Sequence, residues 1–79
     1  MNSWLSERAD ALAAAGDVER GTLELTEEEI DELLDLARIA AHESGDRRNA
    51  PLLCYLVGAA RSSGKSVAEL AEAVRASTS

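Results

Sequence analysis

The sequence is 79 residues long, which is the length of one small domain. Fifteen acidic residues against eight basic ones give a formal net charge of −7. Nucleic acids and anionic membrane surfaces are bound by clusters of Lys and Arg, so this charge argues against both as partners. A domain this small buries a limited core, and contact with a partner protein or a second copy would add to its stability.

Residue usage narrows the class of protein further. The single cysteine, Cys54, cannot form an internal disulfide and has no metal-ligand companion at a useful spacing. No apolar run approaches the roughly 18 residues of a membrane span, and no secretion signal opens the sequence. We therefore expect a cytoplasmic domain that holds neither a metal ion nor another cofactor.

The first predicted helix covers residues 3–15. Ser3 is a suitable N-cap, and Gly16 suits the left-handed position that often follows a helix. The stretch that follows, up to Leu25, is interpreted as a loop attached to the core by its leucines. Trp4 lies off the apolar stripe of the helix, and we expect it to close one end of the core.

The second predicted helix, residues 26–44, has the clearest start signal. Thr26 and Glu29 form a capping box, in which each side chain bonds the amide of the other residue. Leu36 and Ile39 fall outside the main apolar stripe and widen the apolar surface to more than half of the helix. Such a helix is either central in the fold or presents a second face to a partner, for example to a second copy of the chain through these two residues.

The third predicted helix covers residues 49–63. Pro51 lies in its first turn, where a missing amide hydrogen costs little, and Gly64 follows its end. Gly58 lies in its interior, where glycine lowers helix stability, so we expect it to permit close contact with another helix.

The last predicted helix, residues 66–76, begins with a second capping box formed by Ser66 and Glu69. The residues after its end are expected to fray. Together the four segments predict an all-α fold, a single four-helix bundle that spans residues 1–79.

The second predicted helix carries a polar stripe that is a candidate binding surface. By helical geometry its members lie within about 60° of one another: Asp31, Asp35, Arg38 and His42. One interpretation is a recognition stripe in which Arg38 and His42 donate to an anionic or carbonyl group while Asp35 orients Arg38. The other is a solvated face with ordinary ion pairs, in which His42 complements the negative end of the helix dipole.

Two adjacent arginines, Arg47 and Arg48, precede the third predicted helix. Helix amino termini attract anions, and two guanidinium groups would strengthen the attraction. The pattern therefore allows a small anion- or nucleotide-binding site. Against it, Pro51 removes one amide donor, and the two arginines equally fit a solvated loop in an acidic protein.

Motifs for catalysis are absent from the sequence. Gly64-Lys65-Ser66 imitates the end of a phosphate-binding loop, but Ala59 stands where that motif requires its first glycine, and a helix is predicted before it instead of a strand. His42 and Cys54 do not indicate a base and a nucleophile, because the apolar helix around Cys54 would keep its thiol protonated. We therefore expect no catalytic residue.

Several segments of the sequence together resemble a known family. They are residues 35–42, Arg47 or Arg48, residues 50–52, residues 56–60, and Trp4-Leu5 near the start. The pattern resembles a small actinobacterial family of uncharacterised domains, found alone or appended to molybdenum cofactor guanylyltransferase-like proteins. The resemblance implies an association with molybdenum cofactor biosynthesis, with such a guanylyltransferase as the partner.

The resemblance also implies which residues bind. The family pattern falls on Asp35, Arg38, His42, Arg47 or Arg48, and Pro51. Because the sequence lacks a glycine-rich nucleotide-binding loop after a strand, it is not the transferase itself. We predict a non-catalytic accessory or protein-interaction module that uses these residues, the alternatives being the anion-binding site and the structural homodimer described above.

Overall fold

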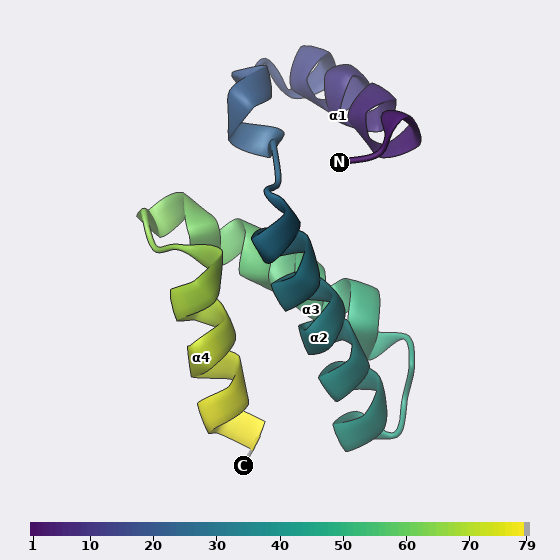
Figure 1. The fold of residues 1–79 in the computed structure, drawn as a ribbon, viewed down its shortest axis with the longest axis vertical. Helices are drawn as coiled ribbons and strands as arrows, with labels where there is room; N and C mark the ends of the chain where they lie inside the picture. Colours follow the sequence, from purple (N-terminus) through teal and green to yellow (C-terminus); the bar gives the residue numbers. More distant parts are fainter. Residues whose placement is uncertain (79) are drawn as a thin grey trace. The chain divides into compact units, whose positions relative to one another are not determined.

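The computed structural model describes residues 1–78, which are all-α (Figure 1). These residues form four α-helices and two short 3-10 helices, with no strand. In chain order the elements are α1 (Ser3–Gly16), η1 (Arg20–Leu23), α2 (Glu27–Ser44), α3 (Asn49–Ala60), η2 (Arg61–Ser63) and α4 (Val67–Thr78). The predicted all-α fold of four helices is confirmed. The chain divides into two compact units, an amino-terminal unit of Met1–Ile30 and a carboxy-terminal unit of Asp31–Ser79.

The amino-terminal unit contains α1, whose caps differ from those predicted. Asn2, and not Ser3, caps its start, because Asn2 Oδ1 accepts a hydrogen bond from the Leu5 amide at 2.8 Å. At the other end Asp17, and not Gly16, takes the left-handed conformation, with a φ of 53°. Aspartate tolerates this conformation better than most residues, which lets α1 continue through Gly16.

The segment after α1, predicted as a loop, contains the 3-10 helix η1. Arg20 holds η1 against α1, because its Nε donates to Asp10 Oδ1 at 2.7 Å. The same guanidinium group reaches Glu24 Oε2, 3.0 Å from its Nη1. Leu23 and Leu25 line an apolar groove of about 180 Å³ together with residues of α1. The leucines of this segment therefore do contact apolar side chains of the same unit.

Trp4 does not close a core, contrary to the prediction. The residue is 63% exposed, and the guanidinium carbon of Arg8 lies 5.0 Å from the centre of its ring. Trp4 therefore makes a cation–π contact at the surface of the amino-terminal unit.

Both predicted capping boxes are present. At the start of α2, Thr26 N donates to Glu29 Oε1 at 2.8 Å, and Glu29 N donates to Thr26 Oγ1 at 3.1 Å. At the start of α4, Ser66 and Glu69 exchange the same two bonds at 3.1 Å each. These bonds satisfy amides that have no partner inside a helix, so both helix starts are encoded locally.

The core of the carboxy-terminal unit is formed by Leu36 of α2, Val57 of α3 and Ala71 of α4. Leu36 and Ala71 are completely buried, and Ile39 packs against them. The expectation that Leu36 lies at the margin of the apolar stripe is wrong: the buried side of α2 is centred on it, whereas Leu34 is 64% exposed. Contact with a second copy through Leu36 is excluded, because its side chain is not at the surface.

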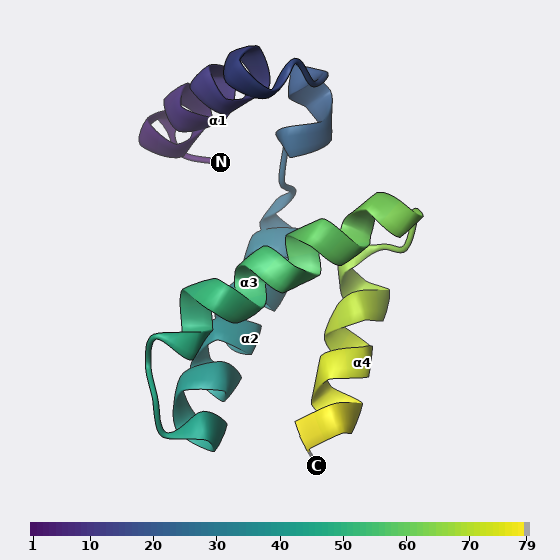
Figure 2. The same cartoon turned by 180° about the vertical axis from the view of Figure 1, so that it is seen from behind.

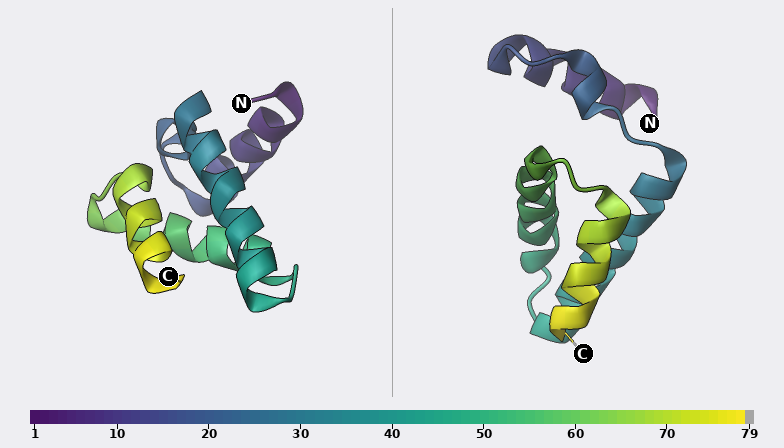
Figure 3. Two further views of the ribbon diagram at one scale, coloured as in Figure 1. Left: turned by 60° about the horizontal axis from the view of Figure 1, so that its bottom comes forward. Right: turned by 90° about the vertical axis from the view of Figure 1, so that its left-hand side faces the viewer.

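In the carboxy-terminal unit α3 crosses on one side, and α2 and α4 lie on the other (Figures 1 and 2). Figure 3 shows the same three helices from two further directions. α3 continues into η2 and ends at Gly64, which has a φ of 92°, as its predicted position after the helix requires. Gly58 does not permit a close helix contact as expected, since a Cβ at this position would meet no atom within 4 Å.

The last helix extends past residue 76, where fraying was expected. Ser77 Oγ donates to the Val74 carbonyl oxygen at 2.7 Å, and Thr78 Oγ1 donates to that of Arg75 at 3.1 Å. The Arg75 carbonyl is one of the last four of the helix, which have no partner inside it, and the Thr78 hydroxyl bonds it. α4 is therefore helical through Thr78, and Ser79 lies outside the described residues.

Candidate functional site

The polar stripe of α2 takes part in the contact between α2 and α4. Arg75 of α4 reaches across, and its Nη2 lies 2.9 Å from both Glu32 Oε2 and Asp35 Oδ2. Asp35 also accepts from Arg38, whose Nη2 lies 2.8 Å from Oδ1. The predicted contact between Asp35 and Arg38 is confirmed. Asp35 is shared by two guanidinium groups, and one of them belongs to another helix.

This sharing sets the charge state of the cluster. The hydrogen bond from Arg38, followed by that from Arg75, holds the pKa of Asp35 below its usual range. The bonds to Asp35 and Glu32 in turn raise the pKa of Arg75. Both partners are therefore charged at neutral pH, and the carboxylate of Asp35 serves to join the two helices.

The carboxyl end of the stripe is open to solvent. His42 lies in the last turn of α2, and both it and Arg38 are exposed. Within residues 1–78 the imidazole of His42 makes no hydrogen bond or ion pair. Asp31, at the other end, is also exposed. Three residues of the stripe are exposed, and the fourth, Asp35, is half-buried and bonded to Arg38 within the stripe and to Arg75 of α4.

Arg48 is held by Asp46 in a compact turn before α3. Arg48 Nη2 lies 2.7 Å from Asp46 Oδ2, and its Nε lies 3.1 Å from both carboxylate oxygens. The same contacts lower the pKa of Asp46. The charge of Arg48 is therefore matched within the loop. Arg47 is exposed and makes no ion pair within the described part of the chain.

The amino end of α3 has few amides left to offer an anion. The amides of Arg48, Asn49 and Ala50 each donate to an acceptor in the preceding turn, at 3.0, 3.0 and 3.2 Å. The next residue, Pro51, has no amide hydrogen. Four consecutive positions therefore lack an available donor, and this geometry disfavours anion binding at the helix terminus.

The structure reveals a surface that the sequence interpretation did not single out. α3 contains no charged residue, and the residue it buries is Val57. Its opposite side exposes four apolar residues at i, i+3, i+4 and i+7: Leu52 (59% exposed), Tyr55 (74%), Leu56 (60%) and Ala59. This spacing places them on one side of a helix. We call these four residues the α3 face.

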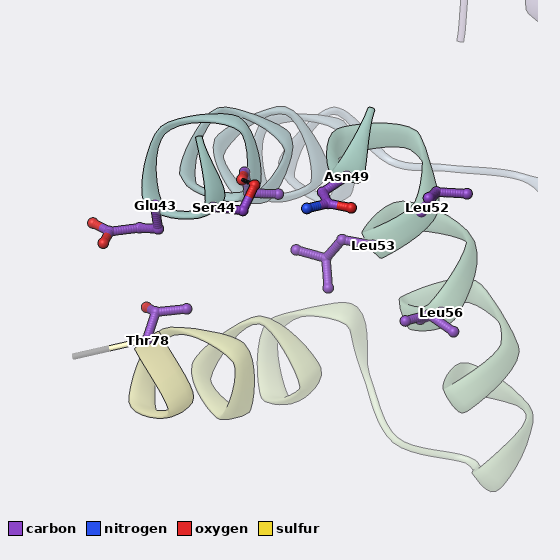
Figure 4. A pocket seen from close by; sticks show the side chains of 8 residues that line it. Glu43, Ser44, Asn49, Leu52, Leu53, Leu56 and Thr78 are labelled. Carbon is purple, nitrogen blue, oxygen red and sulfur yellow. Dashed lines mark hydrogen bonds between the residues drawn. The ribbon is translucent and has the colours of Figure 1, made fainter. Parts of the chain in front are cut away.

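An apolar groove adjoins the α3 face. It has a volume of about 260 Å³, and its lining is Ala40, Glu43, Ser44, Asn49, Leu52, Leu53, Leu56 and Thr78. Leu52 and Leu56 belong to both the groove and the α3 face. Figure 4 shows Leu53 pointing into the space between α2 and α4, whereas the carboxylate of Glu43 points away from the leucines. The groove, which we call the α3 groove, is apolar within and polar at its rim.

Two features of this region were missed by the sequence interpretation. Arg75 was missed because a single basic residue on an outer helix gives no signal of the helix it will contact. The α3 face did leave a signal, since α3 is twelve residues long without a charge. A sequence does not show which of these apolar side chains are buried and which are exposed.

Metal binding, membrane insertion and thiol chemistry can each be compared with the residues that the structure describes. Within residues 1–78 there is no group of three or more His, Cys, Asp or Glu side chains that could hold a metal ion. None of the described helices has both the length and the apolar character needed to traverse a bilayer. Burial raises the pKa of the Cys54 thiol, which lies 3.7 Å from the Leu33 carbonyl oxygen. Such a thiol is protonated at neutral pH and is a poor nucleophile.

Fold and surface together define a small all-α domain with an exposed apolar helix beside an apolar groove. The chain belongs to the family of domains of unknown function designated DUF6457, whose model matches residues 1–79. No curated protein and no solved structure shows a significant match to the chain. The predicted membership of a family of uncharacterised domains is therefore confirmed.

Proposed function

We propose that this domain is a non-catalytic protein-interaction module that docks through the α3 face. The observation that carries the proposal is the exposure of Leu52, Tyr55 and Leu56 on a helix without a single charged residue. Scattered apolar residues are normal at a protein surface, but a continuous apolar patch rimmed by polar groups marks an interaction site. Tyrosine in particular is enriched among the residues that contribute most to binding.

The neighbouring groove supports the same function. Its leucines give an apolar anchor of the partner a place to enter, and its polar rim gives the main chain of the partner hydrogen-bonding groups. Energetically dominant contacts lie in pockets of this kind, surrounded by a rim that excludes water. The α3 face and the α3 groove therefore form one continuous docking surface.

The family resemblance supplies a biochemical setting for the proposal. The domain would act in the cytoplasm, close to molybdenum cofactor maturation, with a molybdenum cofactor guanylyltransferase as its partner. Arg38, His42, Arg47 and Pro51 form the second part of the proposed contact surface, where the first three present exposed donors. Arg48 belongs to it through the loop that it shapes with Asp46, and Asp35 through its bond to Arg38.

The test is binding of the purified full chain to the purified guanylyltransferase, measured by biolayer interferometry. Tyr55→Lys places a charge at the centre of the α3 face and is expected to weaken binding at least about tenfold. Ala73→Lys is the matched control, because it adds the same charge at an exposed position of α4. Equal affinities of these two variants would contradict docking through α3.

The charged part of the surface is tested by the double variant Arg38→Ala, His42→Ala in the same measurement. We expect a smaller loss than from Tyr55→Lys, because exposed charges at the rim of an interface contribute less than buried anchors. Unchanged binding would remove the stripe from the contact surface and leave the α3 face in place.

The alternative of an anion-binding domain is not favoured by the loop geometry. Asp46 already holds Arg48, and the first amides of α3 are bonded or missing. Titration of the labelled chain with phosphate, GTP and a pterin is therefore expected to leave the NMR signals of residues 47–52 unmoved.

A further inference from the structure

The charge of the chain is distributed unevenly around α3. Four of the eight basic residues and none of the fifteen acidic residues lie between Arg47 and Ala68. Asp46, directly before this segment, matches the charge of Arg48, and Arg47 and Lys65 are exposed cations beyond the two ends of the α3 face in a strongly acidic protein. Basic residues beside a docking surface of an acidic protein favour a partner that carries negative charge at that surface.

The basic residues of this segment lie beyond the two ends of α3. Arg47 and Arg48 precede the helix, and Arg61 and Lys65 follow it. A twelve-residue helix is about 18 Å long, and the α3 face, from Leu52 to Ala59, covers about 10 Å of it, so the two pairs lie beyond both ends of the face. Arg47 and Lys65 are exposed and make no ion pair within residues 1–78.

The acidic groups nearest to the α3 face leave Arg47 and Lys65 without an ion pair within residues 1–78. Asp46 lies beside Arg47 in the sequence, but its carboxylate is bonded by Arg48. Glu43 lies on the rim of the α3 groove, and its carboxylate points away from the leucines (Figure 4). Arg47 and Lys65 therefore remain available to a partner, one beyond each end of the α3 face.

We propose that the partner segment is an amphipathic α-helix whose apolar side is flanked by acidic residues. This inference rests on the proposed function and specifies the chemistry of its partner. The helix lies along the α3 face and inserts an apolar side chain between Leu52, Leu53 and Leu56, while its acidic residues meet Arg47 and Lys65. Binding of an amphipathic helix in an apolar groove is a recurrent mode of peptide recognition.

A second copy of the chain is a poorer occupant for an electrostatic reason. A symmetric pair buries the same patch of both copies, so α3 would face the α3 of its partner. Whether the two helices run parallel or antiparallel, basic ends then meet basic ends. Like charges at an interface oppose association, whereas an acidic partner helix is attracted at both ends.

The experiment is selection of binders from a display library of random 18-residue peptides on the immobilised full chain, followed by sequencing. Enriched peptides are expected to carry apolar residues at i, i+3 or i+4, and i+7, with Asp or Glu toward both ends. Synthetic copies of the enriched peptides are then titrated against variants whose folding is checked by circular dichroism. Tyr55→Ala should weaken binding at least about tenfold.

The charge of the partner is tested by a matched pair of variants. Lys65→Glu and Arg8→Glu change the net charge equally, but Arg8 lies in α1, outside the basic segment. Lys65→Glu should weaken binding of the acidic peptide and strengthen binding of a copy with Lys in place of its acidic residues. Arg8→Glu should do neither beyond a small general effect of net charge.

Enrichment of basic or uncharged peptides that still depend on Tyr55 would overturn the acidic partner and leave docking through α3 intact. Two results would overturn this inference: enriched peptides that bind Tyr55→Ala as well as the wild type, or no enrichment beyond that obtained in the same selection on Tyr55→Lys. The measurement with the guanylyltransferase tests the proposed function separately. A dimer in sedimentation that Tyr55→Lys dissociates would replace the acidic helix by a second copy.

Discussion

Helices α3 and α4 are both twelve residues long and pack on the same core, yet their outer sides are opposite in chemistry. α4 buries Val67 and Ala71 and turns Glu69, Glu72 and Arg75 toward polar surroundings. α3 has no charged residue, and its outer side is apolar.

This difference between α3 and α4 distinguishes apolar residues that stabilise the core from apolar residues that lie outside it. Every apolar position of α4 that the helical period places inward is buried or packed, and Arg75 adds a bond to α2. On α3 the exposed leucines and tyrosine contribute little to the core. An exposed apolar patch of this kind is typical of an interaction site, which is why we propose that a partner covers it.

The largest expected effect comes from the residue beneath both helices. Leu36→Ala removes the completely buried side chain at the centre of the core and should lower the free energy of unfolding by about 2–5 kcal/mol. Urea denaturation followed by circular dichroism measures this loss. A change below about 1 kcal/mol would show that α3 and α4 do not share a core at Leu36.

The two sides of α3 should respond differently to truncation. Val57→Ala deletes two buried methyl groups and should cost on the order of 1.5 kcal/mol of unfolding free energy. Tyr55→Ala, on the exposed side, should change it by about 0.5 kcal/mol or less. Equal losses of unfolding free energy for the two variants would mean that the α3 face stabilises the folded chain as much as the core does.

Gly58 provides a further test of whether the outer side of α3 is open. It lies in the helix interior and faces open space, so Gly58→Ala should raise the free energy of unfolding by up to about 1 kcal/mol. Destabilisation would reveal a close neighbour of Gly58 and contradict the open side of α3. Thermal unfolding of the variant beside the wild type is sufficient to decide.

On α4, Arg75→Gln removes the guanidinium group that joins Glu32 and Asp35. We expect a fall in melting temperature smaller than that from Val57→Ala, because the bonds are partly exposed to water. The difference from the wild type should shrink as salt is added, since exposed ion pairs are screened. A loss independent of salt would assign Arg75 a packing role instead.

The smallest effect is the pH dependence of stability. The pKa values of Asp35 and Asp46 are lowered in the folded state, so each carboxylate stabilises the fold above its unfolded pKa of about 3.9. This contribution is lost as the pH falls from there through the lowered folded pKa. Denaturation between pH 5 and pH 2 should therefore show a decline that is shallower in Asp35→Asn, and an identical slope would contradict the shared carboxylate.

The sequence predicted helix starts well because they are local. The capping boxes at Thr26 and Ser66 place donors and acceptors three residues apart, so nothing distant is needed to recognise them. The cap of α1 at Asn2 was missed because Asn and Ser are equally good caps, and adjacent candidates cannot be separated by type alone.

Properties that depend on contact between helices were predicted less well. The helical period of α2 gives a broad apolar arc, and the neighbouring helices decide that Leu36, and not Leu34, is at its buried centre. Likewise, the polar stripe predicted the bond between Asp35 and Arg38, which are three residues apart, but not the bond from Arg75, forty residues away from Asp35. The binding residues inferred from the stripe and loop stay a prediction.

The most direct test of the outward role of α3 is an NMR titration of the ¹⁵N-labelled full chain with an enriched acidic peptide. We expect the largest shifts on residues 52–59 and on Lys65, and no shifts on α1 or on the outer side of α4. Shifts confined to α4 or to the stripe of α2, with α3 unchanged, would contradict this expectation.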